Sequence, residues 1–413
     1  MKILHTSDWH LGQQLFEYDR SEEQQDFLRQ LCHWVATEQP DALIVSGDVF
    51  HYCSPSAAAQ RLYTDALVEF HETCPAMQII ITAGNHDSSS KLEINRNLWK
   101  YAGVTVVGSI RRDEAGQVDL ERHIVEVKNG CGELKGYVIA LPHVYPQNFP
   151  ALDEEVPREE RQYHFIQTLL NRVKERNQGN LPVVLMAHLA LTGSDITGQD
   201  DGRGGMEYTD IRLMGEGYDY LALGHIHFPQ TLPGGRARYC GSPLPVSFDE
   251  SYGHSVSLVE LAAHGAMPEV RTLPVRNAWP LKVLPLQAVP LEEALEVLQA
   301  IPDEEKMYVQ LHVRIQDVPP AYCMERAYEL TRGKQCRFCR YKWEREVVET
   351  QKEITAGRRP FADFFPVAGS SHLLSGQVSA GHRSGDARHA GGSRETGTKS
   401  RGGIVHEITE TDY

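Results

Sequence analysis

Five short polar segments, each directly after an apolar run, constrain this chain more than any other feature of its sequence. The apolar runs have the length of buried strands and are bounded by polar or glycine-containing turns. Because the carboxyl ends of strands in an open α/β sheet face one crevice, we expect the polar segments to converge. They are Asp8-Trp9-His10, Gly47-Asp48-Val49-Phe50-His51, Gly84-Asn85-His86-Asp87, Ala187-His188 and Gly224-His225-Ile226-His227.

Residues 1–260 alternate between apolar runs and helical patterns, which predicts an α/β fold built in layers. Ser21-Glu22-Glu23-Gln24 has the spacing of a capping box that opens a helix, and Pro40 follows the end of that helix. A second helical stretch covers 56–72. Strands are expected around 3–4, 42–45, 78–81, 137–140, 183–186 and 220–223.

A smaller unit of β-α-β-α-β type is expected from Pro280 onward. Its middle strand, 308–315, alternates so that Val309, Leu311 and Val313 share one face. The Gly-, Ser- and His-rich composition after residue 366 predicts a disordered tail. The other elements of the small unit are expected at 281–284, 291–300, 321–332 and 337–343, followed by a charged helix at 344–356. The predicted division of the chain is 1–275, 278–346, 347–366 and 367–413.

The charge balance excludes some classes of partner. With 41 Lys and Arg against 56 Asp and Glu the net charge is −15, so a polybasic coat for nucleic acid is excluded but a local basic patch is not. No apolar run is long enough to cross a membrane, the N-terminus turns polar too early for a signal peptide, and the eight dispersed cysteines suit reduced thiols. We therefore expect a cytoplasmic protein with no membrane partner.

The donor types in the five segments suit metal ions. They are Asp, Asn and His without Cys, and such hard oxygen and imidazole donors favour Mn²⁺, Fe²⁺ or Zn²⁺. A single His of this kind is usually hydrogen-bonded or solvated, so the expectation rests on the five segments together. Seven ligands can hold two ions if one carboxylate bridges, and two ions about 3.5–4 Å apart can stabilise both the attacking and the leaving oxygen of a phosphoryl displacement.

The order of these segments resembles the calcineurin-like metallophosphoesterases. The strings at 3–12, 47–50, 222–227 and 239–250 are further similar to the nuclease subunits of bacterial SbcCD complexes, over about residues 1–365. The resemblance implies a layered α/β metallophosphoesterase sandwich at 1–275 and a capping domain at 278–346 that faces DNA. It also implies an Mn²⁺-dependent nuclease for DNA repair, recombination and replication, acting as a 3′–5′ exonuclease on duplexes and as an endonuclease on single strands.

The resemblance assigns roles to individual residues. His86 would be the general acid that protonates the leaving 3′ oxygen, Asp87 would orient His86, and His51 would help to stabilise the transition state. Two Mn²⁺ ions would share Asp48 as a bridge. The first would be held by Asp8, His10, Asp48 and His227, and the second by Asp48, Asn85, His188 and His225.

Partners and alternatives complete the expectations. No Walker motif occurs, so control by ATP needs a partner, and the resemblance implies an SbcC-like coiled-coil ATPase docked on 347–366 and a homodimer within a heterotetramer.

A basic stretch in the capping domain is either a solvated face or a contact to DNA phosphates; it comprises Arg332, Lys334, Arg337, Arg340, Lys342 and Arg345. Two other functions stay open: a phosphoesterase for small or protein phosphates, and a non-catalytic DNA-binding subunit.

Overall fold

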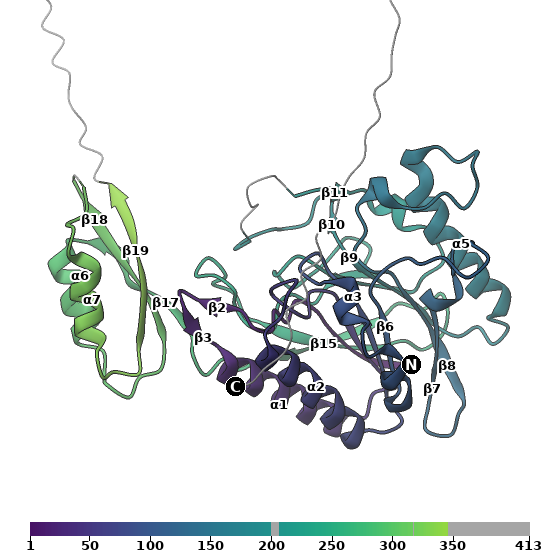
Figure 1. The fold of residues 1–413 in the computed structure, drawn as a ribbon, viewed down its shortest axis with the longest axis horizontal. Coiled ribbons are helices and arrows are strands. Elements are labelled where there is room, and N and C mark those ends of the chain that lie inside the picture. Colours follow the sequence, from purple (N-terminus) through teal and green to yellow (C-terminus); the bar gives the residue numbers. More distant parts are fainter. Residues whose placement is uncertain (200–205, 317, 346–413) are drawn as a thin grey trace, which may run out of the picture. The chain divides into compact units, whose positions relative to one another are not determined.

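The computed structural model of the chain describes residues 1–199, 206–316 and 318–345 (Figure 1). The predicted ATPase-docking segment 347–366, the predicted disordered tail 367–413 and all but two residues of the predicted helix 344–356 lie outside these ranges. Glu344 and Arg345 are described, and they are the last residues of strand β19 (Arg337–Arg345). The helix prediction is therefore wrong at those two positions, where pairing with β18 (Tyr308–Ile315) continues.

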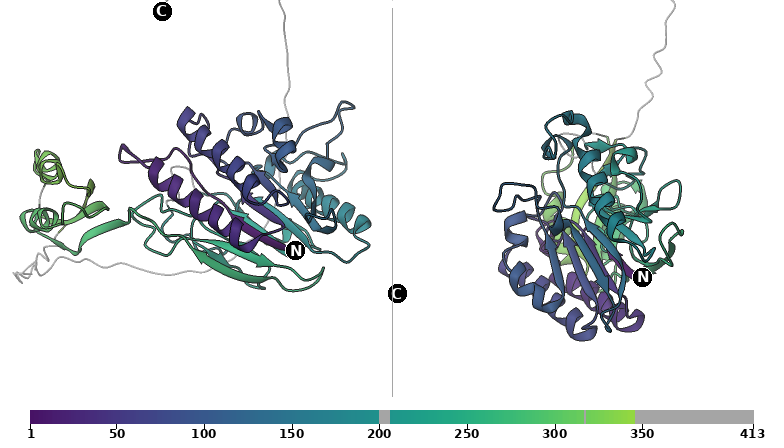
Figure 2. Two further views of the ribbon diagram at one scale, coloured as in Figure 1. Left: turned by 90° about the horizontal axis from the view of Figure 1, so that it is seen from below. Right: turned by 90° about the vertical axis from the view of Figure 1, so that its right-hand side faces the viewer.

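Two mixed six-stranded sheets form the larger part of the described chain (Figures 1 and 2). The first sheet has the order β16-β15-β1-β4-β5-β6, with bounds Glu269–Pro274, Ser255–Glu260, Lys2–Thr6, Ala42–Ser46, Gln78–Thr82 and Val104–Val107. The second sheet has the order β13-β14-β12-β9-β8-β7, with bounds Gln230–Thr231, Ala237–Tyr239, Tyr220–Gly224, Val183–His188, Leu134–Ala140 and Ile124–Lys128.

Helices cover the outer face of each sheet, so the layers are helix, sheet, sheet, helix (Figure 2). Helices α1 (Ser21–Glu38) and α2 (Ala57–Thr73) pack on the first sheet, and α5 (Arg161–Arg176) packs on the second. Side chains alternate between layers: Ile79 and Ile81 of β5 face α1 and α2, whereas Ile80 lies between the sheets. Burial on both faces explains why these strands have continuous apolar runs, and the predicted layered α/β fold is confirmed.

The start of α1 differs from the sequence prediction. Ser21 is the first helical residue rather than the cap, and Arg20 at the cap position makes no side-chain capping bond. Asp19 instead accepts hydrogen bonds from the backbone N–H and the hydroxyl of Ser21, at 2.9 and 2.6 Å. The capping box at 21–24 is therefore wrong, because a carboxylate two residues earlier satisfies the exposed N–H of Ser21.

The small unit has the predicted order β17 (Leu281–Val289), α6 (Leu291–Gln299), β18, α7 (Cys323–Thr331) and β19. Its three strands pair in parallel, and both helices pack on one sheet face with Val309, Leu311 and Val313. The described residues belong to one compact unit, so the boundary predicted between 275 and 278 stays a prediction. A small apolar cluster joins this unit to the sandwich; it comprises Leu15, Phe248, Trp279, Tyr308 and Cys339.

Short elements connect these parts. Their bounds are β2 Gln14–Leu15, β3 Tyr18–Asp19, β10 Ala190–Leu191, β11 Tyr208–Thr209, α3 Ser89–Leu92 and α4 Arg96–Trp99. Single 3₁₀ turns lie at Lys100–Ala102, Glu121–His123, Pro146–Asn148, Arg158–Glu160 and Ile211–Met214. Among the helices of the described ranges, none is both long and apolar enough to cross a membrane.

Candidate metal centre

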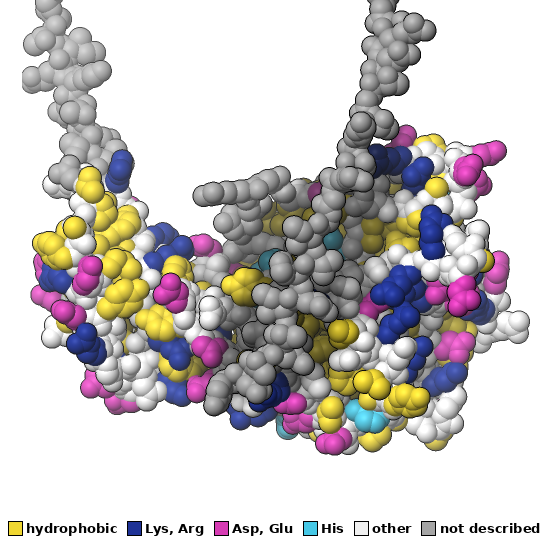
Figure 3. Space-filling model, viewed as in Figure 1, with side chains coloured by type: hydrophobic (Ala, Val, Ile, Leu, Met, Phe, Trp, Pro, Cys, Tyr) yellow, Lys and Arg dark blue, Asp and Glu magenta, His cyan; other side chains and the backbone are white. Residues whose placement is uncertain are grey.

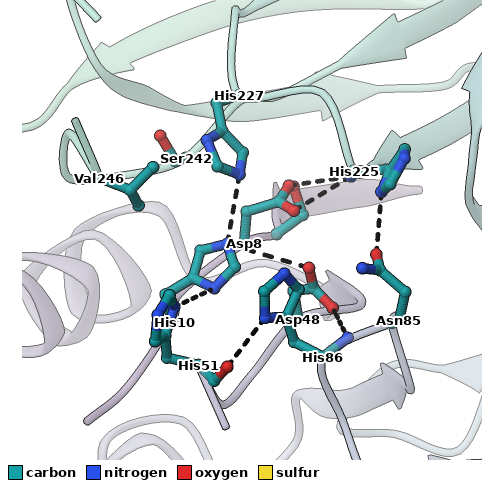
Figure 4. Close-up of polar contacts among 12 residues, drawn as sticks. Asp8, His10, Asp48, His51, Asn85, His86, His225, His227, Ser242 and Val246 are labelled. Atoms are coloured by element: carbon teal, nitrogen blue, oxygen red, sulfur yellow. Dashed lines mark hydrogen bonds and ion pairs between the residues drawn. The ribbon is translucent and has the colours of Figure 1, made fainter. Parts of the chain in front are cut away.

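The five polar segments lie together at one edge of the sandwich, where the parallel strands β1, β4 and β5 of one sheet and β9 and β12 of the other end (Figure 4). The loop after β1 carries Asp8 and His10, and the loop after β12 carries His225 and His227. The backbone N–H of His225 donates to the Asp8 carboxylate at 3.1 Å, so the two sheets meet directly at this point. The structure thus brings every proposed ligand into one region.

Asp8, His10 and His227 form the first donor group. One ligand atom from each lies within 4.8 Å of the others, and the side chains are buried. The Nε2 atoms of His10 and His227 face each other at 3.2 Å (Figure 4). Two imidazole nitrogens and a carboxylate aimed at one point are a donor set that a divalent first-row metal accepts.

Asp48, Asn85, His188 and His225 form the second donor group. Asn85 Oδ1 lies 3.0 Å from His188 Nε2 and 2.9 Å from His225 Nδ1. Asp48 Oδ2 lies 3.4 Å from His188 Nε2 and 3.9 Å from His10 Nε2. One carboxylate oxygen of Asp48 therefore lies between the two groups, which is the position a bridging ligand needs.

Side chains two residues apart point the same way on an extended backbone, but the backbone at Asp8, His10 and His225 is not extended. The φ angles of Asp8, His10 and His225 are 51°, 46° and 92°, in the left-handed region. Such conformations cost free energy in non-glycine residues and collect at functional sites. The pairs Asp8/His10 and His225/His227 therefore converge because the loops turn sharply.

Glycines in the motifs allow the two sheets to approach at the site. A Cβ on Gly224 would lie 2.0 Å from the carbonyl oxygen of Ser46, across the gap between the sheets. A Cβ on Gly84 would lie 2.0 Å from Asp48 Oδ1. Any side chain at either position would therefore displace the groups that hold the ligands.

Burial and neighbouring charges shift the pKa values of these side chains in ways that suit the binding of a cation. Burial lowers the pKa of His10 well below its usual value, so its ring is neutral and offers a free nitrogen. Burial alone would raise the pKa of Asp48, but the adjacent His188 holds that pKa well below its usual range through its charge and a hydrogen bond. Burial raises the pKa of Asp8. Buried carboxylates that rely on histidines for counter-charge fit a site for divalent ions.

His86 and His51 lie beside the first donor group. The ring centroids of His86 and His10 are 4.9 Å apart, and the rings of His86 and His51 are stacked at 5.4 Å. The backbone N–H of His86 donates to Asp48 Oδ1 at 2.9 Å. Ligand atoms of His10, His51 and His86 also lie within 4.8 Å of one another, so the imidazoles assigned to catalysis directly adjoin those assigned to metal.

The direct contact expected between Asp87 and His86 is not made. The ring of His86 donates from Nδ1 to the carbonyl of His51 at 2.8 Å. The carboxylate of Asp87 accepts backbone N–H groups from Val49, Phe50 and Gly84, at 3.1, 2.9 and 2.9 Å. That prediction is wrong because three backbone donors take up the carboxylate; Asp87 ties together the loops that follow β4 and β5.

Three residues at the site were not found by the sequence argument. His143 follows β8 and donates from Nδ1 to the carbonyl of His188 at 2.9 Å; the strand-end rule that selected His188 would have found it. Gln199 accepts from the N–H of His227 and donates to the carbonyl of His225. Glu250 contacts Nδ1 of His227 at 2.9 Å. Gln199 carries no motif signal, and Glu250 ends the 239–250 string that carries the resemblance but was given no role at the site.

Comparisons with known proteins agree with this geometry. Residues 1–229 match the model of the calcineurin-like phosphoesterase family. The SbcD component of the SbcCD nuclease of Rhodobacter capsulatus is 37% identical over 318 residues, which cover 74% of this chain and 78% of that protein. The proteins of the same name from Escherichia coli K12 and Bacillus subtilis 168 are each 31% identical, over 329 and 270 residues. These cover 76% and 63% of this chain, and 78% and 66% of the relatives.

Proposed function

The chain belongs to the calcineurin-like phosphoesterases and is a metal-dependent nuclease of the SbcCD type, and on that premise we propose that it hydrolyses DNA phosphodiesters with two Mn²⁺ ions. Asp8, His10, Asp48 and His227 hold one ion, and Asp48, Asn85, His188 and His225 hold the other. When bound, the ions supply Lewis-acid activation of water and neutralise charge on the phosphate. His86 gives a proton to the leaving 3′ oxygen, and His51 supports the ring of His86 through its carbonyl and by stacking.

The strongest support for two metal ions is the position of Asp48 Oδ2, which lies 3.4 Å from His188 Nε2 and 3.9 Å from His10 Nε2. Asp48→Ala should impair both sites, whereas His10→Ala should weaken mainly one. Calorimetric titration of each variant with Mn²⁺ measures this. Binding of two ions with unchanged affinity by Asp48→Ala would contradict the assignment.

The role of His86 as general acid is tested by comparing a His86 variant with a variant of the proposed metal ligand His188. A general acid contributes about 10²–10⁴-fold to the rate, so His86→Asn should lose that factor in DNA cleavage while Mn²⁺ binding stays unchanged. His188→Asn should lose activity together with metal. On bis-p-nitrophenyl phosphate, whose leaving group hardly needs a proton, His86→Asn should be much less impaired. Equal impairment on both substrates would contradict the role of His86 as acid.

The proposed activities are 3′–5′ exonuclease action on duplex ends and endonuclease action on single strands. A duplex with blocked 3′ ends should resist cleavage, and a circular single strand should be cut. The alternative is a phosphoesterase for small or protein phosphates. Efficient hydrolysis of a phosphate monoester with Mn²⁺, and none of DNA, would favour that alternative.

Within the basic stretch, we propose Arg340 and Lys342 as the residues that contact DNA phosphates. The guanidinium of Arg337 lies 3.8 Å from the ring centre of Trp279 and donates to the carbonyl of Asp19, and Lys334 bonds to the carbonyl of Ile301, so both charges have partners within the protein. Arg340 and Lys342 have exposed side chains two residues apart on β19; Nε of Arg340 donates to Gln310 Oε1 at 3.0 Å, but its side chain stays exposed. Figure 3 shows Lys and Arg mixed with Asp and Glu on the face that it draws, rather than gathered in a band. Neutralising Arg340 and Lys342 should weaken duplex binding and lower its salt dependence by about two phosphate contacts.

An ATPase partner and a homodimer complete the proposal. The relatives carry the name of one component of a complex, and we place an SbcC-like coiled-coil ATPase on 347–366. For the homodimer, the short segment 94–101 carries three exposed apolar residues, Ile94, Leu98 and Tyr101, at 76, 68 and 88% exposure, which a second copy can cover. Leu98→Asp should give monomers in light scattering, while Met267→Asp, at an exposed site elsewhere, should not. An unchanged mass for Leu98→Asp would contradict this interface.

A further inference from the structure

His227 is held by a buried carboxylate on the side of its ring opposite the proposed ion. Its Nδ1 lies 2.9 Å from Glu250 Oε1, and the two residues are 8 and 5% exposed. A carboxylate can only accept at this distance, so Nδ1 carries a proton. In the neutral ring Nε2 then has a free lone pair. That atom is the one that faces His10 Nε2 at 3.2 Å.

The chain segment that carries Glu250 also fixes the backbone of His227. Ser242 donates its backbone N–H to the carbonyl of His227 at 3.1 Å, and its hydroxyl donates to Glu250 Oε2 at 3.2 Å. Gly241 has φ +78°, and a Cβ there would lie 2.4 Å from the same carbonyl. Both the main chain and the ring of His227 are therefore positioned by residues 241–250.

The other proposed histidine ligands have different partners at Nδ1. His188 donates from Nδ1 to the carbonyl of Ser46 at 2.8 Å, whereas Nδ1 of His225 faces the second donor group itself, 2.9 Å from Asn85 Oδ1. His10 contacts the ring of His51 at 3.3 Å. A charged acceptor increases the electron density that an imidazole offers to a metal more than a neutral acceptor does, and partners of this kind tune metal affinity.

We propose that Glu250 is a positioning residue that selects the ligand form of His227 and thereby sets the Mn²⁺ affinity of the Asp8–His10–His227 group. The inference rests on the proposed function, because it requires that this group binds Mn²⁺. Glu250 acts through His227 and touches neither the ion nor the substrate. If this proposal is right, replacing Glu250 should weaken Mn²⁺ binding at only one of the two metal sites.

The test compares Glu250→Gln with Asp249→Asn, a matched neutralisation of the exposed neighbouring carboxylate. Calorimetric titration with Mn²⁺ should show one site weakened about 10–100-fold in Glu250→Gln, the range for such partners. The second site should keep its affinity, and Asp249→Asn should match the wild type. Nitrogen NMR of the apoprotein should show the Nδ1–H form of His227 in the wild type and a changed tautomer ratio in Glu250→Gln.

A double-mutant cycle separates positioning from general support of the fold. In a His227→Gln background, Glu250→Gln should cause no further loss of Mn²⁺ affinity. Equal loss at both sites, additive losses in the cycle, or wild-type affinity in Glu250→Gln would each overturn the inference. Failure of the wild type to bind two Mn²⁺ ions would instead overturn the proposed function, so the two failures are distinguishable.

Discussion

Gly84→Ala should disable metal binding while leaving the protein folded. An added Cβ would lie 2.0 Å from Asp48 Oδ1 and 2.4 Å from the backbone nitrogen of Asp48. Contacts of a Cβ under 3.0 Å essentially never occur, so the carboxylate oxygen must move by at least 3.0 − 2.0 = 1.0 Å. Rotation of the side chain can move the oxygen, but the backbone nitrogen cannot rotate away.

The expected loss of Mn²⁺ affinity follows from how little metal–ligand distances can vary. Ligand distances vary by only about 0.2 Å, so a shift of this size removes Asp48 from its place between the two donor groups. We expect Mn²⁺ affinity to fall by at least about 100-fold, more than for loss of an outer partner. Crowding in a packed interior should cost about 1–3 kcal/mol of stability, which a folded domain of this size tolerates.

Calorimetric titration with Mn²⁺ and thermal unfolding of the metal-free protein measure the two effects separately. Gly253→Ala is the matched control, because a Cβ there meets nothing within 4 Å and its φ lies outside the left-handed region. The control should bind two ions with wild-type affinity. If Gly84→Ala also binds two ions normally, the placement of Asp48 as the shared ligand is refuted.

Further predictions concern pH and the small unit. Burial by itself would lower the pKa of His188, but the neighbouring Asp48 has the larger effect and raises that pKa to about 9. Below this pH, Mn²⁺ must displace a proton from His188 in order to bind. The Mn²⁺ affinity measured by calorimetry should therefore rise about tenfold per pH unit up to about pH 9 and level off above it. Tyr308→Phe removes a buried hydroxyl that donates to Glu23, and denaturant unfolding should show a loss of about 1.5–3 kcal/mol. Tyr328→Phe, at a 45% exposed side chain, should change stability far less; equal losses would contradict the role of the Glu23 contact.

The sequence by itself determined the layers and the edge of the sandwich where the proposed ligands lie. Continuous apolar runs such as 42–45 and 78–81 require burial on both faces, which two stacked sheets with outer helices provide. Polar residues that follow such strands must come together at the edge where parallel strands end. The alternation in 308–315 likewise determined the middle strand of the small unit.

Only the tertiary structure decided how the site residues are held. Asp87 binds backbone amides of the neighbouring loop, Asp19 serves the start of α1, and Glu250 supports His227 from 23 residues away. Asp8 and His10, whose backbone is left-handed, likewise donate their N–H groups to the carbonyls of Gly47 and Asp48 in the loop after β4. Periodicity reports which face of an element is buried, but a polar side chain bonds to whichever group the packed sheets bring near. That neighbour is known only once elements distant in sequence have met.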